Sequence, residues 1–262
     1  MKAASSTPTN SNLPPAVHDR SVWYGRASAH QRDWIEWLTN EEVEEVRCAV
    51  ERAEGGIEKL RTIMARDVAL PTLGARLRGM LEEVLEGQGF VVIKGLPVQS
   101  WTRREAAIAF LVIGGQLGAL RMQNAAGHLL GHVKDLGKSG DDPNTRIYQT
   151  RERQTYHTDS CDVVGLLCLH KAKSGGLSSL VSSTTIFNEM RQRRSDLVRV
   201  LMQPIETDRR GETPAGSKPY FNIPVFNYHE GLVSTIYQRQ YIESARRFPD
   251  VPPLTPQQIE AL

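Results

Sequence analysis

The sequence is poor in cysteine. It contains only Cys48, Cys161 and Cys168, and no two of them form a C-x-x-C pair. Proteins that depend on disulfides carry paired sets of cysteines, whereas cytosolic proteins keep their thiols reduced. An odd number of scattered thiols therefore argues against a disulfide framework. We expect reduced cysteines and a cytoplasmic location.

Long apolar runs and an excess of charge of one sign are also lacking. No stretch approaches the roughly 20 apolar residues that a membrane-spanning helix needs. The 32 Lys and Arg residues are nearly balanced by 30 Asp and Glu residues, which gives a formal net charge of +2. A protein whose main partner is a nucleic acid or an acidic membrane normally carries clustered basic charge. The composition therefore argues against both partners.

The N-terminus lacks the features of a targeting segment. Its beginning, MKAASSTPTNSNLPP, contains no apolar core of a signal peptide. The first arginine is Arg20, which argues against a transit peptide. We expect residues 1–20 to form a disordered lead-in to a domain at residues 21–262.

Motifs of two common enzyme classes are absent. There is no glycine-rich phosphate-binding loop and no internal repeat. The segment Gly175-Gly176-Leu177-Ser178 lacks the G-x-S-x-G pattern, which disfavours a serine hydrolase. At 262 residues and 40% hydrophobic content, the chain is nevertheless long enough to bury a substantial core.

Helical patterns dominate the first half of the chain. Thr39 and Glu42 have the spacing of a capping box, and the valines that follow recur on one helical face. A short apolar strand interrupts the helices and stops at Gly95 and Pro97. The predicted elements are a helix that starts at Thr39, a helix at 77–89 that ends at Gly87 or Gly89, a strand at 90–97, a helix at 102–118 and a long surface loop at 127–144.

The pattern changes from helical to extended near Thr145. Short apolar runs are separated by turn residues, as in an antiparallel sandwich or barrel. One predicted helix at 184–202 interrupts them and begins after Ser182 or Ser183. The apolar runs are TRIYQ at 145–149, VVGLLCL at 163–169, LSSLVS at 177–182, NIPVFNY at 222–228 and GLVSTIY at 231–237.

One polar triplet leads directly into a predicted buried strand. In YHTDSCD, at 156–162, His157 and Asp159 are two positions apart, so an extended backbone points both side chains to one face. An imidazole nitrogen and a carboxylate oxygen together suit a divalent metal such as Fe(II), Mn(II) or Zn(II). Two other interpretations stay open: a hydrogen-bonded His–Asp pair at a strand end, and a zinc site that adds Cys161.

Several segments resemble, in the same order, those of a known family. From about Gly89 to Leu262 the chain is similar to the taurine dioxygenase-like (TauD/TfdA) family of iron- and 2-oxoglutarate-dependent oxygenases. Each segment alone carries little weight, but the ordered series is specific. The matching segments are GFVVIKGLP, IGGQLGAL, YHTDSCD, SGGLSSLVSSTTIFNEM, PVFNYHEGLVSTIYQRQYI and PPLTPQQIEAL.

The resemblance implies both a fold and a chemistry. The fold is of mixed α and β, mainly β, character: a double-stranded β-helix, or jelly roll, with flanking helices. Fe(II) is held by two histidines and one carboxylate, with His157 as the first histidine and Asp159 as the carboxylate. 2-Oxoglutarate and O2 are the cosubstrates, succinate and carbon dioxide are the co-products, and the substrate is a small organic molecule.

Three further residues receive roles from the resemblance. Ser178 lies where the family often has a threonine after the double glycine, so its hydroxyl would bind a carboxylate of 2-oxoglutarate. The alternative is a strand serine bonded to backbone. Asn124 and Arg153 lie near the substrate contacts of the family, and the alternative for both is a solvated loop residue. We interpret the remaining histidines of this half as loop or structural residues: His128, His132, His170 and His229.

The resemblance also predicts an incomplete domain. The second iron-binding histidine of the family and its 2-oxoglutarate-binding arginine lie well past the segment that matches LTPQQ, and this sequence ends at Leu262. Thr255, Pro256 and Gln258 have the pattern of a helix start, which normally precedes about 10–14 residues of helix. We therefore expect a jelly roll without its last strands and a chain with little turnover of its own. The alternative function is a non-catalytic remnant that binds metal weakly or not at all.

Overall fold

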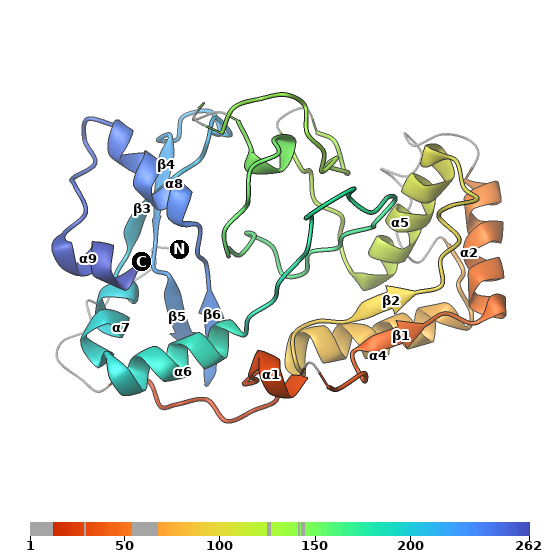
Figure 1. Cartoon of the computed structure of the whole chain (residues 1–262), viewed down its shortest axis with the longest axis horizontal. Helices are drawn as coiled ribbons and strands as arrows, with labels where there is room; N and C mark the ends of the chain where they lie inside the picture. The colour runs from red at the N-terminus through yellow and green to blue at the C-terminus, as the bar shows by residue number, and fades with distance from the viewer. Residues whose placement is uncertain (1–12, 29, 54–67, 125–126, 141, 143–144) are drawn as a thin grey trace.

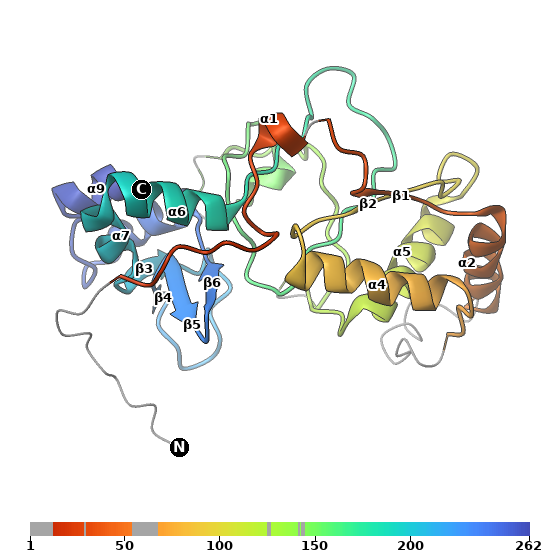
Figure 2. The same cartoon turned by 90° about the horizontal axis from the view of Figure 1, so that it is seen from below.

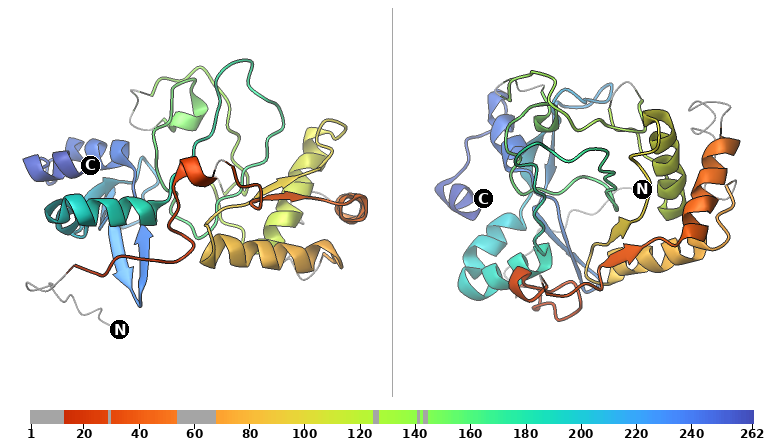
Figure 3. Two further views of the ribbon diagram at one scale, coloured as in Figure 1. Left: turned by 60° about the horizontal axis from the view of Figure 1, so that its bottom comes forward. Right: turned by 45° about the vertical axis from the view of Figure 1, so that its right-hand side comes forward.

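The computed structural model describes residues 13–262 with the exception of 29, 54–67, 125–126, 141 and 143–144. Its helices and strands form two groups on either side of a central region, residues 118–182, that is mostly coil (Figures 1 and 3). Each group has a hydrophobic core of its own. None of the helices in the described part of the chain has the length and apolar character needed to cross a bilayer.

Within the described residues, the first group consists of three long helices that pack together beside a short parallel pair of strands, and the four-residue helix α1 comes before them in the chain. Val46, Leu73, Leu77 and Ile108 are buried where the helices meet, and β1 pairs with β2 in parallel. The elements are α1 (Gly25–Ser28), β1 (Ile35–Trp37), α2 (Asn40–Arg52), α4 (Leu73–Glu86), β2 (Val92–Lys94) and α5 (Arg103–Leu117).

The helix ends in this group follow local sequence signals. The Thr39 hydroxyl accepts from the amide of Glu42 while the Glu42 carboxylate accepts from the amide of Thr39, so the predicted capping box is confirmed. Thr102 and Glu105 form a second capping box at the start of α5. Gly87 is the C-cap of α4. It is one of the two glycines predicted to end the helix at 77–89. These local predictions succeed because every group involved lies within one helical turn.

The second group joins two antiparallel strand pairs to helices. Phe187, Val198, Ile205 and Phe226 form its core. The sequence predicts one helix at 184–202, but the backbone of Arg194 leaves helical geometry, with φ −144° and ψ 63°, and two helices result. The elements are α6 (Ser183–Arg193), α7 (Ser195–Leu201), β3 (Ile205–Asp208) paired with β4 (Tyr220–Ile223), β5 (Phe226–His229) paired with β6 (Leu232–Thr235), α8 (Arg239–Ser244), the 3-10 helix η3 (Ala245–Arg247) and α9 (Pro256–Ala261).

The central region departs most from the sequence-based predictions. The runs 145–149, 163–169 and 177–182 are predicted as strands, but none of them pairs with a strand in the described part of the chain. The first contains the 3-10 helix η2 (Ile147–Gln149), and the other two are coil. Leu177 is 93% exposed. Apolar runs alone do not make a strand, because the backbone also needs a hydrogen-bonded neighbour.

The β structure consequently remains open. The strands within the described residues form three separate two-stranded sheets and no closed barrel. The predicted mixture of helix and strand is therefore confirmed. A jelly roll is not formed as a closed unit here, since a barrel requires each strand to pair on both edges.

The N-terminal segment 13–24, here called the strap, lies along α6 before it reaches the first group (Figure 2). Its contacts begin at Leu13, which packs against the core of the second group and lies before the boundary at residue 20 that composition predicts, whereas residues 1–12 lie outside the described part. The side chains of α6 and its N-cap bind the backbone of the strap, which is coil apart from a turn at 19–21. The bonds join Pro14 to Arg191, Val17 to Asn188, Ser21 to Ser182 and Trp23 to Thr185.

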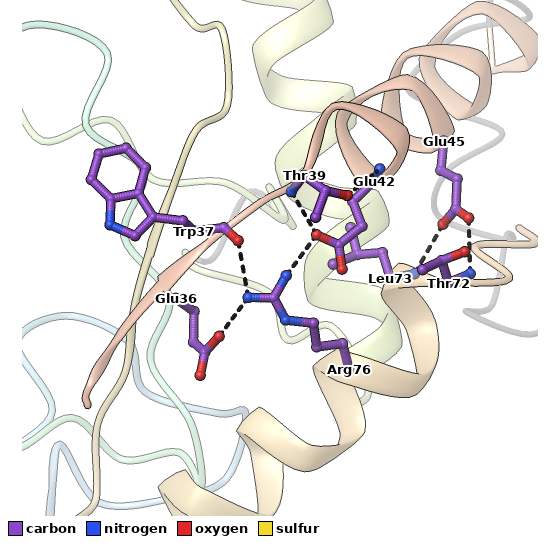
Figure 4. Close-up of polar contacts among 8 residues, drawn as sticks. All are labelled: Glu36, Trp37, Thr39, Glu42, Glu45, Thr72, Leu73 and Arg76. Atoms are coloured by element: carbon purple, nitrogen blue, oxygen red, sulfur yellow. Dashed lines mark hydrogen bonds and ion pairs between the residues drawn. The ribbon is translucent and has the colours of Figure 1, made fainter. Parts of the chain in front are cut away.

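Figure 4 shows a junction of charged side chains that fastens α2, α4 and β1 together. Arg76 of α4 donates to Glu42 at 2.6 Å, to Glu36 at 2.5 Å and to the carbonyl of Trp37 at 3.0 Å. Only 2% of the Glu42 side chain is exposed. Burial alone would raise the pKa of Glu42, but the Thr39 amide and the Arg76 guanidinium hold that pKa below its usual range.

In a second contact at the same junction, a side chain of α2 binds the backbone at the start of α4. The N-cap of α4 makes no side-chain capping bond of its own. Glu45 of α2 supplies the acceptors instead, because its carboxylate oxygens lie 2.8 Å from the amide of Thr72 and 3.0 Å from the amide of Leu73. A carboxylate at a helix N-terminus satisfies free amides and interacts favourably with the helix dipole. Each helix therefore stabilises the other.

We predict that Arg76→Met lowers the free energy of unfolding by about 2 kcal/mol, because it leaves the buried Glu42 carboxylate without its counter-ion. Arg20→Met is the matched control. Arg20 forms an equally direct pair with Glu83, at 2.7 Å, but 67% of its side chain is exposed, so its loss costs less than about 1 kcal/mol. Urea unfolding at pH 7 measures both values. Equal losses would show that burial of Glu42 does not matter.

The same variant has a predicted pH signature. A carboxyl group whose pKa is lowered by folding adds stability above its unfolded pKa of about 4.3, and that stability is lost as the pH falls through the lower folded pKa. The stability difference between the native protein and Arg76→Met should therefore be largest at neutral pH and should shrink below about pH 4. A difference that stays constant between pH 7 and pH 3 would contradict the role of the ion pair.

Candidate metal site

The candidate site lies in the coil between η2 and α6. His157 is half-buried there, and its two ring nitrogens have different partners. Nδ1 lies 2.8 Å from the carbonyl oxygen of Thr155, and Nε2 lies 3.0 Å from the side-chain nitrogen of Gln154. A carbonyl only accepts, so Nδ1 carries the proton and donates it. An amide nitrogen only donates, so Nε2 holds the lone pair.

This tautomer is the one that suits a metal ligand. Histidines that bind metals usually donate their second ring nitrogen to a carbonyl or a carboxylate, which fixes the ring and makes the other nitrogen a better ligand. The bond from His157 to Thr155 provides this arrangement. The amide of Gln154 occupies the position that a metal would take.

Asp159 supplies an exposed carboxylate beside this histidine in the sequence. Within the described residues its side chain has no hydrogen bond or ion pair, so its oxygens are available to a cation. Burial raises the pKa of the Cys161 thiol, and the negative charges of Asp159 and Asp162 raise it further. The thiol therefore stays protonated, and the segment has a negative local potential that favours cations.

The triplet does not lie on a strand, so the prediction that strand geometry points His157 and Asp159 to one face is wrong. Residues 156–162 are coil and bends, and no ladder enforces the alternation of side chains. In the part of the chain that the structure describes, no three His, Cys, Asp or Glu side chains converge as a metal site. The zinc hypothesis that adds Cys161 therefore lacks support, and its thiol instead lies 3.5 Å from the carbonyl of Val163. The donor types of His157 and Asp159 fit a divalent metal as two of its ligands.

Among the described residues, a pair of hydrogen bonds links the segment to Tyr237. Thr158, between the two candidate ligands, donates its amide to the carbonyl of Tyr237 at 2.8 Å. Its hydroxyl accepts from the amide of Tyr237, also at 2.8 Å. Neither Tyr237 nor Gln154 was predicted as part of the site. Their roles depend on the folded positions of the backbone and leave no motif in the sequence.

The other predicted site residues lie apart from any shared cluster. Ser178 is exposed in coil after the double glycine, and Arg153 is exposed four residues before His157. The side chain of Asn124 pairs with His128, at 3.0 Å to the ring Nδ1 and 3.3 Å to the amide, and so closes a turn in its own loop. The substrate and cosubstrate roles of these three residues therefore remain proposals.

A comparison with known protein families supports the resemblance seen in the sequence. Residues 56–262 match the family described as taurine catabolism dioxygenase TauD, TfdA family. The chain belongs to the TauD/TfdA family. The matched range includes the metal-site segment, the double glycine and all four strands of the second group. The resemblance seen in the sequence is thereby confirmed.

Two known proteins are similar to this TauD/TfdA chain. FR-33289 synthase of Streptomyces rubellomurinus is 30% identical over 226 residues, which cover 86% of this chain and 67% of that protein. Taurine hydroxylase-like protein SAT17 of Stachybotrys chartarum is 28% identical over 198 residues, which cover 73% of this chain and 51% of that protein. The chain therefore spans about two thirds of one relative and half of the other.

We predict that Asp159→Ala abolishes a Mn(II) site that the native protein shows in isothermal titration. Mn(II) is a redox-stable replacement for Fe(II) with the same preference for oxygen and imidazole ligands. Asp162→Ala is the matched control, because it removes an exposed carboxylate from the same segment without removing a predicted ligand. We expect the control to bind Mn(II) like the native protein. Unchanged binding in Asp159→Ala would place the metal elsewhere.

Proposed function

We propose that this protein is an Fe(II)- and 2-oxoglutarate-dependent dioxygenase that oxidises a small organic substrate and releases succinate and carbon dioxide. The observation that carries the proposal is the state of His157. Its Nδ1 donates to the Thr155 carbonyl, so Nε2, which now faces the Gln154 amide, is the nitrogen that can bind a metal, two residues before the Asp159 carboxylate. Membership of a dioxygenase family supports the same assignment.

His157 and Asp159 are the residues that would hold the metal. When bound, iron supplies the oxidising chemistry and the protein supplies binding and orientation. The Thr155 carbonyl keeps the ring of His157 in one orientation, and Gln154 must release Nε2 when a metal binds. Among the described residues no three His, Cys, Asp or Glu side chains converge on one point, so we propose that a further histidine completes the site, as the family resemblance implies.

Ser178 is proposed to bind a carboxylate of 2-oxoglutarate. It is exposed, and in the described residues its hydroxyl has no hydrogen-bond partner, so a ligand does not have to displace one. Gly175 and Gly176, just before it, have φ of 69° and 65°. Side-chain-bearing residues rarely adopt this left-handed conformation. The glycines therefore set the direction in which the chain reaches Ser178.

The proposed function is tested by uncoupled turnover of the whole protein as its gene encodes it. We expect succinate to form from 2-oxoglutarate when Fe(II), O2 and ascorbate are present. Asp159→Ala should abolish succinate formation, whereas Asp162→Ala should retain it. No succinate from the native protein, together with no Mn(II) binding, would favour the non-catalytic remnant. Equal succinate from all three proteins would show that the metal site lies elsewhere.

We also predict that Ser178→Ala weakens 2-oxoglutarate binding by about 1–3 kcal/mol, through loss of a hydrogen bond to a charged group. Ser178→Thr keeps the hydroxyl and should bind normally. Ser179→Ala is the control, because it removes the neighbouring exposed hydroxyl. Titration of 2-oxoglutarate into the Mn(II)-loaded whole protein measures the affinities. An unaltered affinity in Ser178→Ala would mean that the hydroxyl has no ligand.

A further inference from the structure

We propose that Thr158 is the positioning residue of the metal site, and that it holds His157 and Asp159 in place by pairing with the backbone of Tyr237. The inference rests on the proposed function, because it gives Thr158 a role only if its two neighbours bind a metal. It adds a residue that touches neither metal nor substrate. Its effect is transmitted through the backbone of the triplet.

The first support is that the pairing is reciprocal. The amide of Thr158 donates to the carbonyl of Tyr237, and the amide of Tyr237 donates to the hydroxyl of Thr158, both at 2.8 Å. Two bonds between the same two residues fix orientation as well as distance. Because His157 and Asp159 are bonded directly to Thr158 on either side, fixing this residue restricts the directions of both candidate ligands.

The second support is that, within the described part of the chain, residues 153–162 make no other long-range hydrogen bond. Among the described hydrogen bonds of residues 153–162, those of Thr158 are the ones that reach more than three positions along the chain. His157 bonds within its own segment, to Gln154 and Thr155. With no strand ladder at the triplet, the Thr158–Tyr237 pair replaces the support that a sheet would give.

The third support is that Tyr237 is itself held firmly. It follows β6, and the amide of the preceding Ile236 donates to the carbonyl of Val225 at 2.9 Å. The ring of Tyr237 packs against the core of the second group, and its hydroxyl donates to the carbonyl of Leu262 at 2.7 Å. Burial raises the pKa of this hydroxyl, so it stays protonated and remains a donor. Thr158 is therefore attached to a rigid point of the fold.

The chemistry of the pair limits which residues can serve at position 158. The amide of Tyr237 needs an acceptor on the side chain, and a hydroxyl on Cβ supplies it at the observed distance. Valine has nearly the same shape as threonine but no acceptor, so it leaves the Tyr237 amide without its bond. Serine keeps the acceptor and loses only the methyl group. The two substitutions therefore separate hydrogen bonding from packing.

The test measures Mn(II) affinity in the whole protein and four variants, Thr158→Val, Thr158→Ser, Ser160→Ala and Asp159→Ala. We expect Thr158→Val to weaken Mn(II) binding by about 10- to 100-fold, the range typical for residues that orient metal ligands. Thr158→Ser should bind within about threefold of the native protein, given that it keeps the hydrogen-bond acceptor. Ser160→Ala, which removes an exposed hydroxyl two positions away, should be unchanged.

A second measurement follows the pair without metal. Hydrogen exchange at the amide of Tyr237 should be slow in the native protein and in Thr158→Ser, and clearly faster in Thr158→Val. Faster exchange together with native Mn(II) affinity would overturn the inference, because the pair would then be structural only. Weakened affinity in both Thr158→Val and Thr158→Ser would overturn it too, since the hydroxyl would not be the cause.

The same measurements distinguish an error in the proposed metal site from an error in the role of Thr158. If the native protein binds no Mn(II), or if Asp159→Ala binds it normally, the metal site itself is wrong and the role of Thr158 falls with it. If Asp159→Ala loses the metal and Thr158→Val keeps it, only the positioning role is wrong. Thermal unfolding of each variant checks that it is folded at the temperature at which Mn(II) binding is measured.

Discussion

Side chains, rather than neighbouring strands, pair the backbone of the irregular segments that connect this fold. Every buried or constrained backbone amide and carbonyl needs a partner, and the strand pairs are short and isolated from one another. Glu45 therefore caps α4 from another helix, and α6 binds the strap through Asn188 and Thr185. Thr158 does the same for the metal-site segment. The arrangement of the molecule depends on these few side-chain contacts.

The candidate site combines a histidine whose ring is hydrogen-bonded on both nitrogens with a carboxylate that has no partner among the described residues. A ring that donates from Nδ1 to a carbonyl leaves Nε2 as the nitrogen that can bind a cation. The negative charges near Cys161 attract that cation. The local chemistry at His157 and Asp159 thus agrees with the family assignment, although the two rest on different observations.

Much of this fold could be predicted where the signals are local. The capping boxes at Thr39 and Thr255 and the end of α4 at Gly87 each involve residues within a turn of one another, and all are confirmed. The roles of His157 and Asp159 come from the family resemblance, because the strand on which their shared face depended is coil. The partner of Thr158 could not be predicted, because it lies 79 positions away. The strands predicted in the central region are not formed. Strand formation depends on a partner that is distant in the chain, and an apolar run does not specify that partner.

The strap has a consequence for how the molecule unfolds. Besides its bonds to α6, it reaches the first group through Trp23, whose indole donates to the carbonyl of Gln88 and packs edge-on against Phe90. Arg20 adds a bidentate pair with Glu83 of α4. One short segment therefore contacts both groups at once, and its release removes contacts from each. Two cores that could melt separately are coupled by this segment into a more cooperative unit.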